Sequence, residues 1–379
     1  MTSPVPAYST EAASAAYLAA LTSIGVGTIE EALALWQEVP VTRIEETRDT
    51  WLEKAIAMIL SRRSMSRDLG VAYYRLMRAL TTGRTTPDPR EPEKRYVTMA
   101  ELRSEFSRLT DKASAGPQRD AAGPAEPSRN DSTPAPQKPS QPPRPEPAQP
   151  KPDQVSSDAE ADRILVEELE GITAAGDAEE ARLEREAEEE ARLVLETLGP
   201  DNLSRNLDEL DNTAPASEVD QAREALHVTS GNRQAAAAAR VVKDGARGTV
   251  WSHGERDKRY LGYARISTSG TPCGWCAMLI SRGAVYRSAK SATATFDDGD
   301  KYHDNCYCVA VPIFSREQYA GPEFALNRRY SELWPQVTRG LSGKAAVSAW
   351  RRFIRAEQAA QRRARPGGDA PRTPNVQEA

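Results

Sequence analysis

The chain has 379 residues, with 50 Lys and Arg, 55 Asp and Glu, and a formal net charge of -5. Hydrophobic residues make up 39% and aromatic residues 6% of it, which excludes one large core and favours two modest folded regions joined by disordered chain. The near balance of charge excludes a surface that is basic all over, as a nucleic-acid coat requires, but it allows a local basic patch.

We expect no contact with a membrane. No run approaches the roughly 18–20 apolar residues that span a bilayer. No cationic segment precedes the Ala-rich residues 12–21, so we expect no secretion signal. The sequence therefore predicts a protein that is made and used in the cytoplasm.

Residues 1–110 form the first predicted unit, a small helical domain. Apolar side chains recur there at helical spacing, and the pairs Thr28–Glu31 and Thr98–Glu101 each have the form of a helix-capping box. The segment contains no Cys, no His and no Gly-rich phosphate loop. These residues predict a domain that docks and does not catalyse.

Two low-complexity segments follow. Between residues 113 and 153 lie 12 of the chain's 27 prolines, so residues 111–157 are predicted to be a disordered, semi-rigid linker. Because it contains PxxP spacings, the alternative is that this segment is a ligand for a proline-binding domain. Residues 158–212 are predicted to form an acidic helical segment that ends at Gly199–Pro200. Its apolar stripe is too sparse for a coiled-coil seam, which leaves a solvated helix or an oligomerisation arm.

Residues 215–362 form the second predicted unit, an α+β domain. A helical segment with an alanine run at 235–239 comes first. From Val250 to about Phe314, Gly, β-branched and aromatic residues become frequent, and helical spacing then returns. Residues 363–379 are predicted to be a disordered tail. The fold class expected for the whole chain is α+β and mostly helical.

The cysteines are the strongest chemical signal. Cys273 and Cys276 form a C-x-x-C pair, and His303, Cys306 and Cys308 form H-x-x-C-x-C about thirty residues later. Structural zinc takes four nitrogen or sulfur ligands in a tetrahedron, so the cluster predicts a structural zinc site. Because there are five candidate ligands, one of them is expected to lie outside the coordination shell. Cys306 and Cys308 would face the same side of a strand, so either or both qualify as ligands. The alternatives are cysteines packed without metal and a redox or nucleophilic thiol.

The remaining candidates carry less signal. His253 lies in a polar, turn-like stretch and is predicted to be a surface residue, whereas His227 lies on a helix without a motif. The acidic run 297–300 lacks the distal Glu of a calcium loop and is predicted to be a turn. The sequence contains neither a G-x-S-x-G elbow nor a Walker loop.

The C-terminal region is basic. Trp350 and Phe353 are interleaved with its arginines, a pattern that could contact DNA phosphates or bind the acidic helix of the same chain. These arginines are Arg328, Arg329, Arg339, Arg351, Arg352, Arg355, Arg362, Arg363 and Arg365.

The run RISTSGTPCGWCAMLISRGAVY, followed by YHDNCYCVAVP, resembles the MuF-like minor head proteins of phages that infect actinobacteria, over roughly residues 215–320. The resemblance implies a protein present in few copies that associates with portal, capsid or scaffold proteins. It implies action in procapsid assembly and in DNA packaging or delivery, first in the host cytoplasm and then in the virion head. The family's cysteine and histidine positions fall on the five candidate ligands named above.

Genes of this type are also labelled capsid maturation proteases, which is the rival interpretation. A protease would need a nucleophile with a positioned base, for which Cys273 or Cys276 with His253 is the available combination. The helical N-terminal region is unlike the β-rich core of a herpesvirus-type maturation protease. A toxin-like or ADP-ribosylating module fused to a MuF-like domain is a third possibility, and the short helical region after Phe314 disfavours it.

Overall fold

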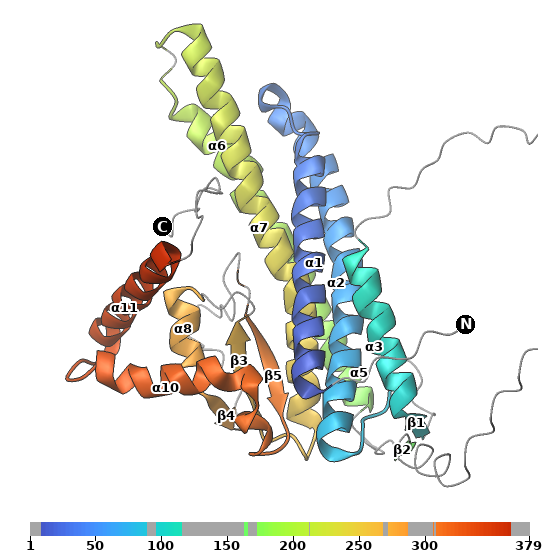
Figure 1. The fold of residues 1–379 in the computed structure, drawn as a ribbon. Helices are drawn as coiled ribbons and strands as arrows, with labels where there is room; N and C mark the ends of the chain where they lie inside the picture. The colour runs from blue at the N-terminus through green and yellow to red at the C-terminus, as the bar shows by residue number, and fades with distance from the viewer. Residues whose placement is uncertain are drawn as a thin grey trace, which may run out of the picture.

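The computed structural model describes residues 9–88, 96–115, 163–165, 173–211, 213–267, 272–286, 306 and 308–364. This part of the chain is mostly helical with a few short strands, which confirms the predicted fold class. Figure 1 shows long helices side by side, with a small sheet and the C-terminal helices beside one end of them. Most of the predicted linker and tail lies outside the described residues.

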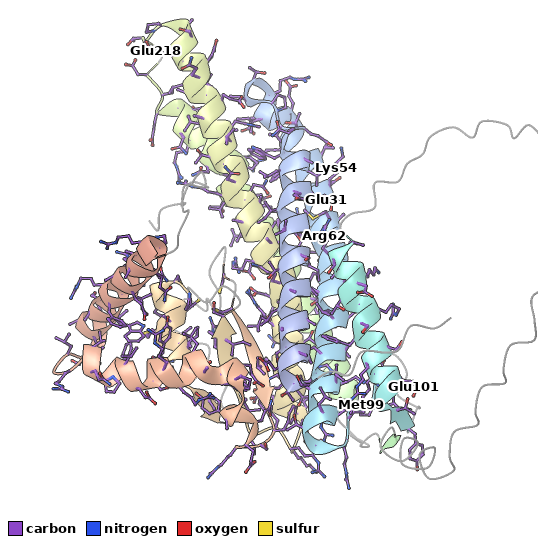
Figure 2. The ribbon with its side chains drawn as sticks, viewed as in Figure 1. Glu31, Lys54, Arg62, Met99, Glu101 and Glu218 are labelled. Carbon is purple, nitrogen blue, oxygen red and sulfur yellow. The ribbon has the colours of Figure 1, made fainter. Side chains whose placement is uncertain are left out.

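The long helices are α1 (Thr10–Trp36), α2 (Ile44–Thr82), α3 (Met99–Ser114) and α7 (Ala216–Arg256), and the short η1 (Val41–Arg43) precedes α2. They share one apolar core. Tyr17 of α1 and Tyr73 of α2 stack with ring centroids 4.0 Å apart, and Trp36 meets Trp51 edge to face. At the surface, Glu31 of α1 pairs with Arg62 of α2 at 2.6 Å, and Figure 2 labels both residues.

One of the two predicted capping boxes is present. Thr98 is the N-cap of α3, and its side chain and that of Glu101 each accept a hydrogen bond from the other's backbone N–H. The Thr28 prediction is wrong. Thr28 lies inside α1, fully buried, and its hydroxyl donates to the Ile24 carbonyl at 2.7 Å. The apolar sequence on both sides of Thr28 keeps the helix continuous across it.

Helix α1 also corrects the expectation that no stretch is apolar and long enough to cross a membrane. By length and composition alone it qualifies, but 56% of its most apolar window is buried inside the protein. Core helices of soluble proteins meet the same criterion, and α1 packs against α2, α3 and α7. The packing accounts for its apolar character.

Helix α7 joins the two regions that the sequence separated. Trp36 Nε1 of α1 donates to the His227 carbonyl at 3.0 Å. Gly70 of α2 meets the backbone of α7 so closely that a Cβ there would lie 2.8 Å from the Ala246 carbonyl oxygen. The expected boundaries at 110 and 215 remain predictions, but the helices on either side of them share one core.

The acidic segment is α5 (Thr173–Leu198), and Pro200 begins the next helix, α6 (Pro200–Asp208), so the predicted end at Gly199–Pro200 is confirmed. One face of α5 is buried against the long helices through Ala187, Ala191 and Leu195. Its carboxylates pair with arginines of α2 and α7, in the pairs Glu184–Arg63 (3.0 Å), Glu180–Arg67 (2.6 Å) and Glu190–Arg240 (2.5 Å). The acidic helix is therefore an outer layer of the bundle.

The main sheet has the order β4-β3-β5, all antiparallel, from β3 (Gly262–Ser267), β4 (Ala284–Tyr286) and β5 (Cys308–Ile313). A second pair joins β1 (Tyr96–Thr98) to β2 (Arg163–Leu165). Strand β5 packs against α7 and α2, whereas β3 contacts α8 (Gly274–Ile280) and α10 (Ala325–Val337). The short η2 (Gln318–Ala320) and η3 (Pro322–Phe324) lead into α10. The sheet therefore lies between the long helices and the C-terminal helices (Figure 1).

A second, smaller core lies on the far side of the sheet. Helices α8, α10 and α11 (Gly343–Ala364) enclose Trp350, which is fully buried. The rings of Tyr330, Trp334 and Phe353 lie 5.2–5.5 Å from it, centroid to centroid. Three cysteines belong to the same cluster of buried side chains.

Candidate metal centre

The C-x-x-C pair lies at the start of α8. Cys273 is the N-cap, and its sulfur accepts a hydrogen bond from the Cys276 backbone N–H at 3.3 Å. Cys276 follows in the first turn and is 1% exposed, whereas Cys273 is half-buried. The turn therefore directs both side chains to one place.

The second pair reaches the same place from β5. Cys308 begins β5 opposite Ser267 of β3, and Cys306 precedes it by two residues. The sulfurs of Cys276, Cys306 and Cys308 all lie within 4.8 Å of one another, and Cys276 Sγ is 3.5 Å from Cys306 Sγ. None of the four cysteines forms a disulfide. His303, the fifth predicted ligand, lies outside the described residues.

Basic side chains surround the cysteines. Lys243 Nζ and Arg247 Nη2, both from α7, each donate to the Cys306 carbonyl at 2.9 Å, and Arg247 Nη2 also donates to the Cys308 carbonyl at 2.9 Å. Arg265 of β3 places Nη1 4.0 Å from Cys276 Sγ and is 2% exposed. Sequence reasoning missed all three cations. The available signal was a Lys and an Arg spaced i, i+4 in an Ala-rich helix, because that spacing puts both on one face.

Helices α10 and α11 fix the loops that carry the cysteines. Asn327 Nδ2 of α10 donates to the Arg265 carbonyl at 2.8 Å and to the Ile280 carbonyl at 3.2 Å, which ties β3 to the end of α8. Gln358 Nε2 of α11 donates to the Pro272 carbonyl, beside Cys273, at 2.7 Å. Hydrogen bonds from α10 and α11, together with those from Lys243 and Arg247 of α7, therefore hold the backbone around the cysteines.

The thiols differ in acidity. Hydrogen bonds from Cys276 and Cys308, with help from the nearby Arg247 and Arg265, hold the pKa of Cys306 well below its ordinary value. The hydrogen bond with Cys273, followed by those with Cys306 and Cys308 and by burial, raises the pKa of Cys276. Cys276 lowers the pKa of Cys308, but the hydrogen bond with Cys306 and burial outweigh it and raise that pKa to about 12. The hydrogen bonds among the three sulfurs, with Arg247 and Arg265 nearby, therefore favour a thiolate within the cluster.

The geometry suits a single thiophilic cation. A tetrahedral Zn²⁺ with bonds of about 2.3 Å to sulfur separates its sulfurs by roughly 3.8 Å. The 3.5 Å contact and the 4.8 Å limit bracket that value. The buried cluster of Cys276, Cys306 and Cys308 could thus hold a metal ion, with Cys273 adjacent.

The two described histidines lie elsewhere. His227 is buried, with its ring stacked on Trp36 and Nε2 2.9 Å from the Val39 carbonyl. His253 was predicted to be a surface residue in a turn, and this is wrong because α7 continues through it. It is half-buried, its Nδ1 donates to the Thr249 carbonyl at 2.9 Å, and burial is the main cause that lowers its pKa to about 4. Neither histidine hydrogen-bonds to a cysteine.

The basic C-terminal region differs from expectation in its aromatic residues. Trp350 and Phe353 belong to the small core and do not line the surface beside the arginines. Arg328 donates to the Tyr319 and Gly321 carbonyls, and Arg329 pairs with Glu357. The other predicted arginines within the described residues are exposed, namely Arg339, Arg351, Arg352, Arg355, Arg362 and Arg363. The acidic α5 pairs with α2 and α7, so the alternative of an α5 partner for this region gains no support.

Comparison with known proteins supports the interpretation that the chain is a phage protein. The family described as VG15 protein matches residues 173–334, a segment that contains α5, α7, the sheet and all four cysteines. Among curated proteins, the Gene 15 protein of Mycobacterium phage L5 is 30% identical over 165 residues, covering 34% of this chain and 55% of that protein. The Gene 15 protein of Mycobacterium phage D29 is 31% identical over 97 residues, covering 19% of this chain and 34% of that protein. The chain thus spans about half or less of these relatives, and no solved structure matches it.

Proposed function

We propose that the chain is a MuF-like minor capsid protein that acts in phage head morphogenesis, in procapsid assembly and in DNA packaging or delivery at the portal. The similarity to phage proteins over residues 173–334 supports it, because that segment holds the cysteines and the helix α7 that packs on the N-terminal helices. The proposed partners are portal, capsid or scaffold proteins. The proposed location is the host cytoplasm during assembly and then the virion head.

The observation that carries a binding role is the burial of the cysteines. Cys276, Cys306 and Cys308 are each 1% exposed, which suits a closed structural site and leaves no open position for a substrate. In this proposal the bound ion is zinc, and its binding free energy adds directly to folding of the small C-terminal core. A zinc ion here would link α8 to β5.

The capsid maturation protease gains no support from the described residues. A catalytic cysteine is partly exposed and has a base within hydrogen-bonding reach. His253 instead donates Nδ1–H to its own helix, and its ring lies 5.5 Å from that of Tyr74. The cysteines face each other and the basic residues of α7 and β3.

The DNA part of the proposal rests on α11. At 3.6 residues per turn, all six of its cations fall within an arc of about 120°, opposite the buried Trp350 and Ile354. They are Lys344, Arg351, Arg352, Arg355, Arg362 and Arg363. The arc runs about 28 Å along the axis, and Glu357, the only acid of α11, already pairs with Arg329. Such a face suits binding to the phosphates of duplex DNA. It would not recognise bases by stacking, because the aromatic rings of this region are buried.

The head-assembly proposal is tested in the phage that encodes the chain. The gene is inactivated, then complemented with the wild-type gene or with Cys276→Ser, and heads are counted by electron microscopy while the protein is quantified in purified procapsids. We expect few copies per procapsid, and a loss of filled, infectious heads that only the wild-type gene restores. Normal infectious particles without the gene, or absence of the protein from procapsids, would overturn the proposal.

The DNA contact is tested by fluorescence anisotropy of the purified full chain with two 30-base-pair duplexes of unrelated sequence. We expect similar affinity for both, falling steeply with salt at a slope of about -0.9 per phosphate contacted. Replacing Arg352, Arg362 and Arg363 with Gln should reduce the steepness of the plot of log affinity against log salt concentration by about two to three. A matched variant with the exposed Arg43, Arg185 and Arg192 replaced by Gln should not change it. Equal effects of both triples would remove α11 from the proposal.

A further inference from the structure

Cys276 is the centre of the sulfur cluster. Its sulfur lies 3.5 Å from Cys306 Sγ and within 4.8 Å of Cys308 Sγ, and its backbone N–H donates to Cys273 Sγ at 3.3 Å, so the N-cap cysteine is hydrogen-bonded to the residue at the centre of the cluster. A tetrahedral ion needs four donors. Four cysteines from two short segments supply that number without any further residue.

Cys273 has the environment of a ligand and not of a spare cysteine. The backbone N–H of Cys276 points at its sulfur at 3.3 Å, and an N–H donated to sulfur stabilises negative charge there. Gln358 holds the Pro272 carbonyl next to it, which fixes the backbone on which Cys273 turns. The side chain is therefore oriented before any ion binds.

Four thiolates around one Zn²⁺ carry a net charge of -2, and a buried charge of that size is costly unless opposite charge lies close by. The site supplies it. Arg265 lies 4.0 Å from Cys276 Sγ, and Arg247 bridges the carbonyls of Cys306 and Cys308. Arg265 and Arg247 are 2% and 4% exposed as whole residues, so little water screens their charges from the sulfurs.

From these contacts we propose that Cys273, Cys276, Cys306 and Cys308 together bind one zinc ion as a tetrathiolate, and that Arg265 and Arg247 compensate its charge. His303 is then outside the ligand set. The inference deepens the zinc clamp of the proposed function, and it selects four ligands from the five that the sequence offers.

The ligand set is tested by spectroscopy of the purified full chain. Elemental analysis should give one zinc per chain, and exchange of zinc for Co²⁺ should give the intense sulfur-to-metal charge-transfer absorption of four thiolates. Cys273→Ser should lower that absorption by about one quarter, whereas His303→Gln should leave the spectrum unchanged. The reverse result, or a wild-type spectrum of only three thiolates, would overturn the proposal. So would iron in place of zinc, or no bound metal.

The role of the arginine is tested by zinc affinity, measured in competition with a chromophoric chelator. Arg265→Gln should weaken zinc binding by about 10- to 100-fold, the range typical of groups that contact metal ligands, while Arg265→Lys keeps the charge and should recover most of it. Arg316→Gln, at an exposed site on the loop after β5, is the matched control. Equal losses for Gln and Lys at 265 would contradict charge compensation.

The test of the ligand set and the test of the head-assembly role can fail independently. If heads fail without the gene but the spectrum shows three thiolates and a histidine, the head role stands and the tetrathiolate is wrong. If the tetrathiolate is found but heads form normally without the gene, the metal site stands and the head role is wrong.

Discussion

Arg78 and Asp257 form a fully buried ion pair that joins α2 to the residue ending α7. Arg78 Nε donates to Asp257 Oδ2 at 2.5 Å, and the two side chains are 0% and 1% exposed. Tyr74 donates its hydroxyl to the same carboxylate oxygen at 3.0 Å, and burial together with this carboxylate raises the pKa of Tyr74 well above its ordinary value. The pair lies where the long helices meet the start of the sheet.

Removing one member of this pair should strongly destabilise the protein. Asp257→Asn leaves the Arg78 charge buried without its counterion, and we expect the free energy of unfolding to fall by about 3–5 kcal/mol. Urea denaturation of the full chain, followed by circular dichroism, measures the change.

The exposed pair Lys54–Glu38 provides the control for that prediction. Both side chains are about half exposed, so Glu38→Gln should cost less than about 1 kcal/mol. The double variant Arg78→Met with Asp257→Leu should recover much of the loss, because it leaves no buried charge. Equal losses at the buried and the exposed pair would show that Arg78 and Asp257 are hydrated in solution.

Substitution by alanine should change the stability of the protein in opposite directions at two glycines of α7. A Cβ on Gly231 would lie 2.5 Å from Trp36 Cδ1, so Gly231→Ala should force Trp36 out of place and destabilise the protein by about 1–3 kcal/mol. Nothing lies within 4 Å of a Cβ on Gly248, so Gly248→Ala should stabilise it by about 0.5–1 kcal/mol through helix propensity. Thermal unfolding of the two variants beside the wild type measures both, and a stabilising Gly231→Ala would contradict the packing of α1 on α7.

His253 should make stability depend on pH. Burial, with Arg256, Arg75 and Arg67 adding positive charge, lowers its pKa from 6.5 to about 4. Between those values the unfolded chain binds the proton and the folded chain does not, so stability is fully present above pH 6.5 and is lost as pH falls towards 4. In His253→Asn, which can keep the hydrogen bond to Thr249, the denaturation midpoint should fall less steeply over this window. An unchanged slope would show that His253 is hydrated when the protein is folded.

The sequence predicted features whose cause is local. The Thr98–Glu101 capping box and the end of α5 at Gly199–Pro200 depend on neighbours along the chain, and both are confirmed. The Thr28 box failed because tertiary packing of α1 overrides a cap signal. His253 failed for a similar reason, since the polar residues around it continue α7 and do not form a turn.

The candidate site divides in the same way. The spacing of the cysteines was enough to predict that they gather, and three of them do. The roles of Lys243, Arg247 and Arg265 arise only when α7 and β3 are packed beside β5, and no spacing along the chain encodes that. The same holds for Trp350 and Phe353. Their spacing among arginines suggested surface residues, and only the packing of α8 and α10 against α11 shows that they belong to a core.

Metal removal should loosen the small core and leave the long helices intact. The large core holds α1, α2, α3 and α7 through apolar packing, whereas α8 and β5 meet through their cysteines in the separate cluster around Trp350. Hydrogen–deuterium exchange of the full chain before and after chelation should therefore rise in α8 and α11 and stay nearly constant in α1, α2 and the part of β5 that packs in the large core. Cys276→Ser should give the chelated pattern without chelator, and readdition of zinc should restore protection only in the wild type. A uniform rise across α1 and α8 would instead mean that the two cores unfold as one unit.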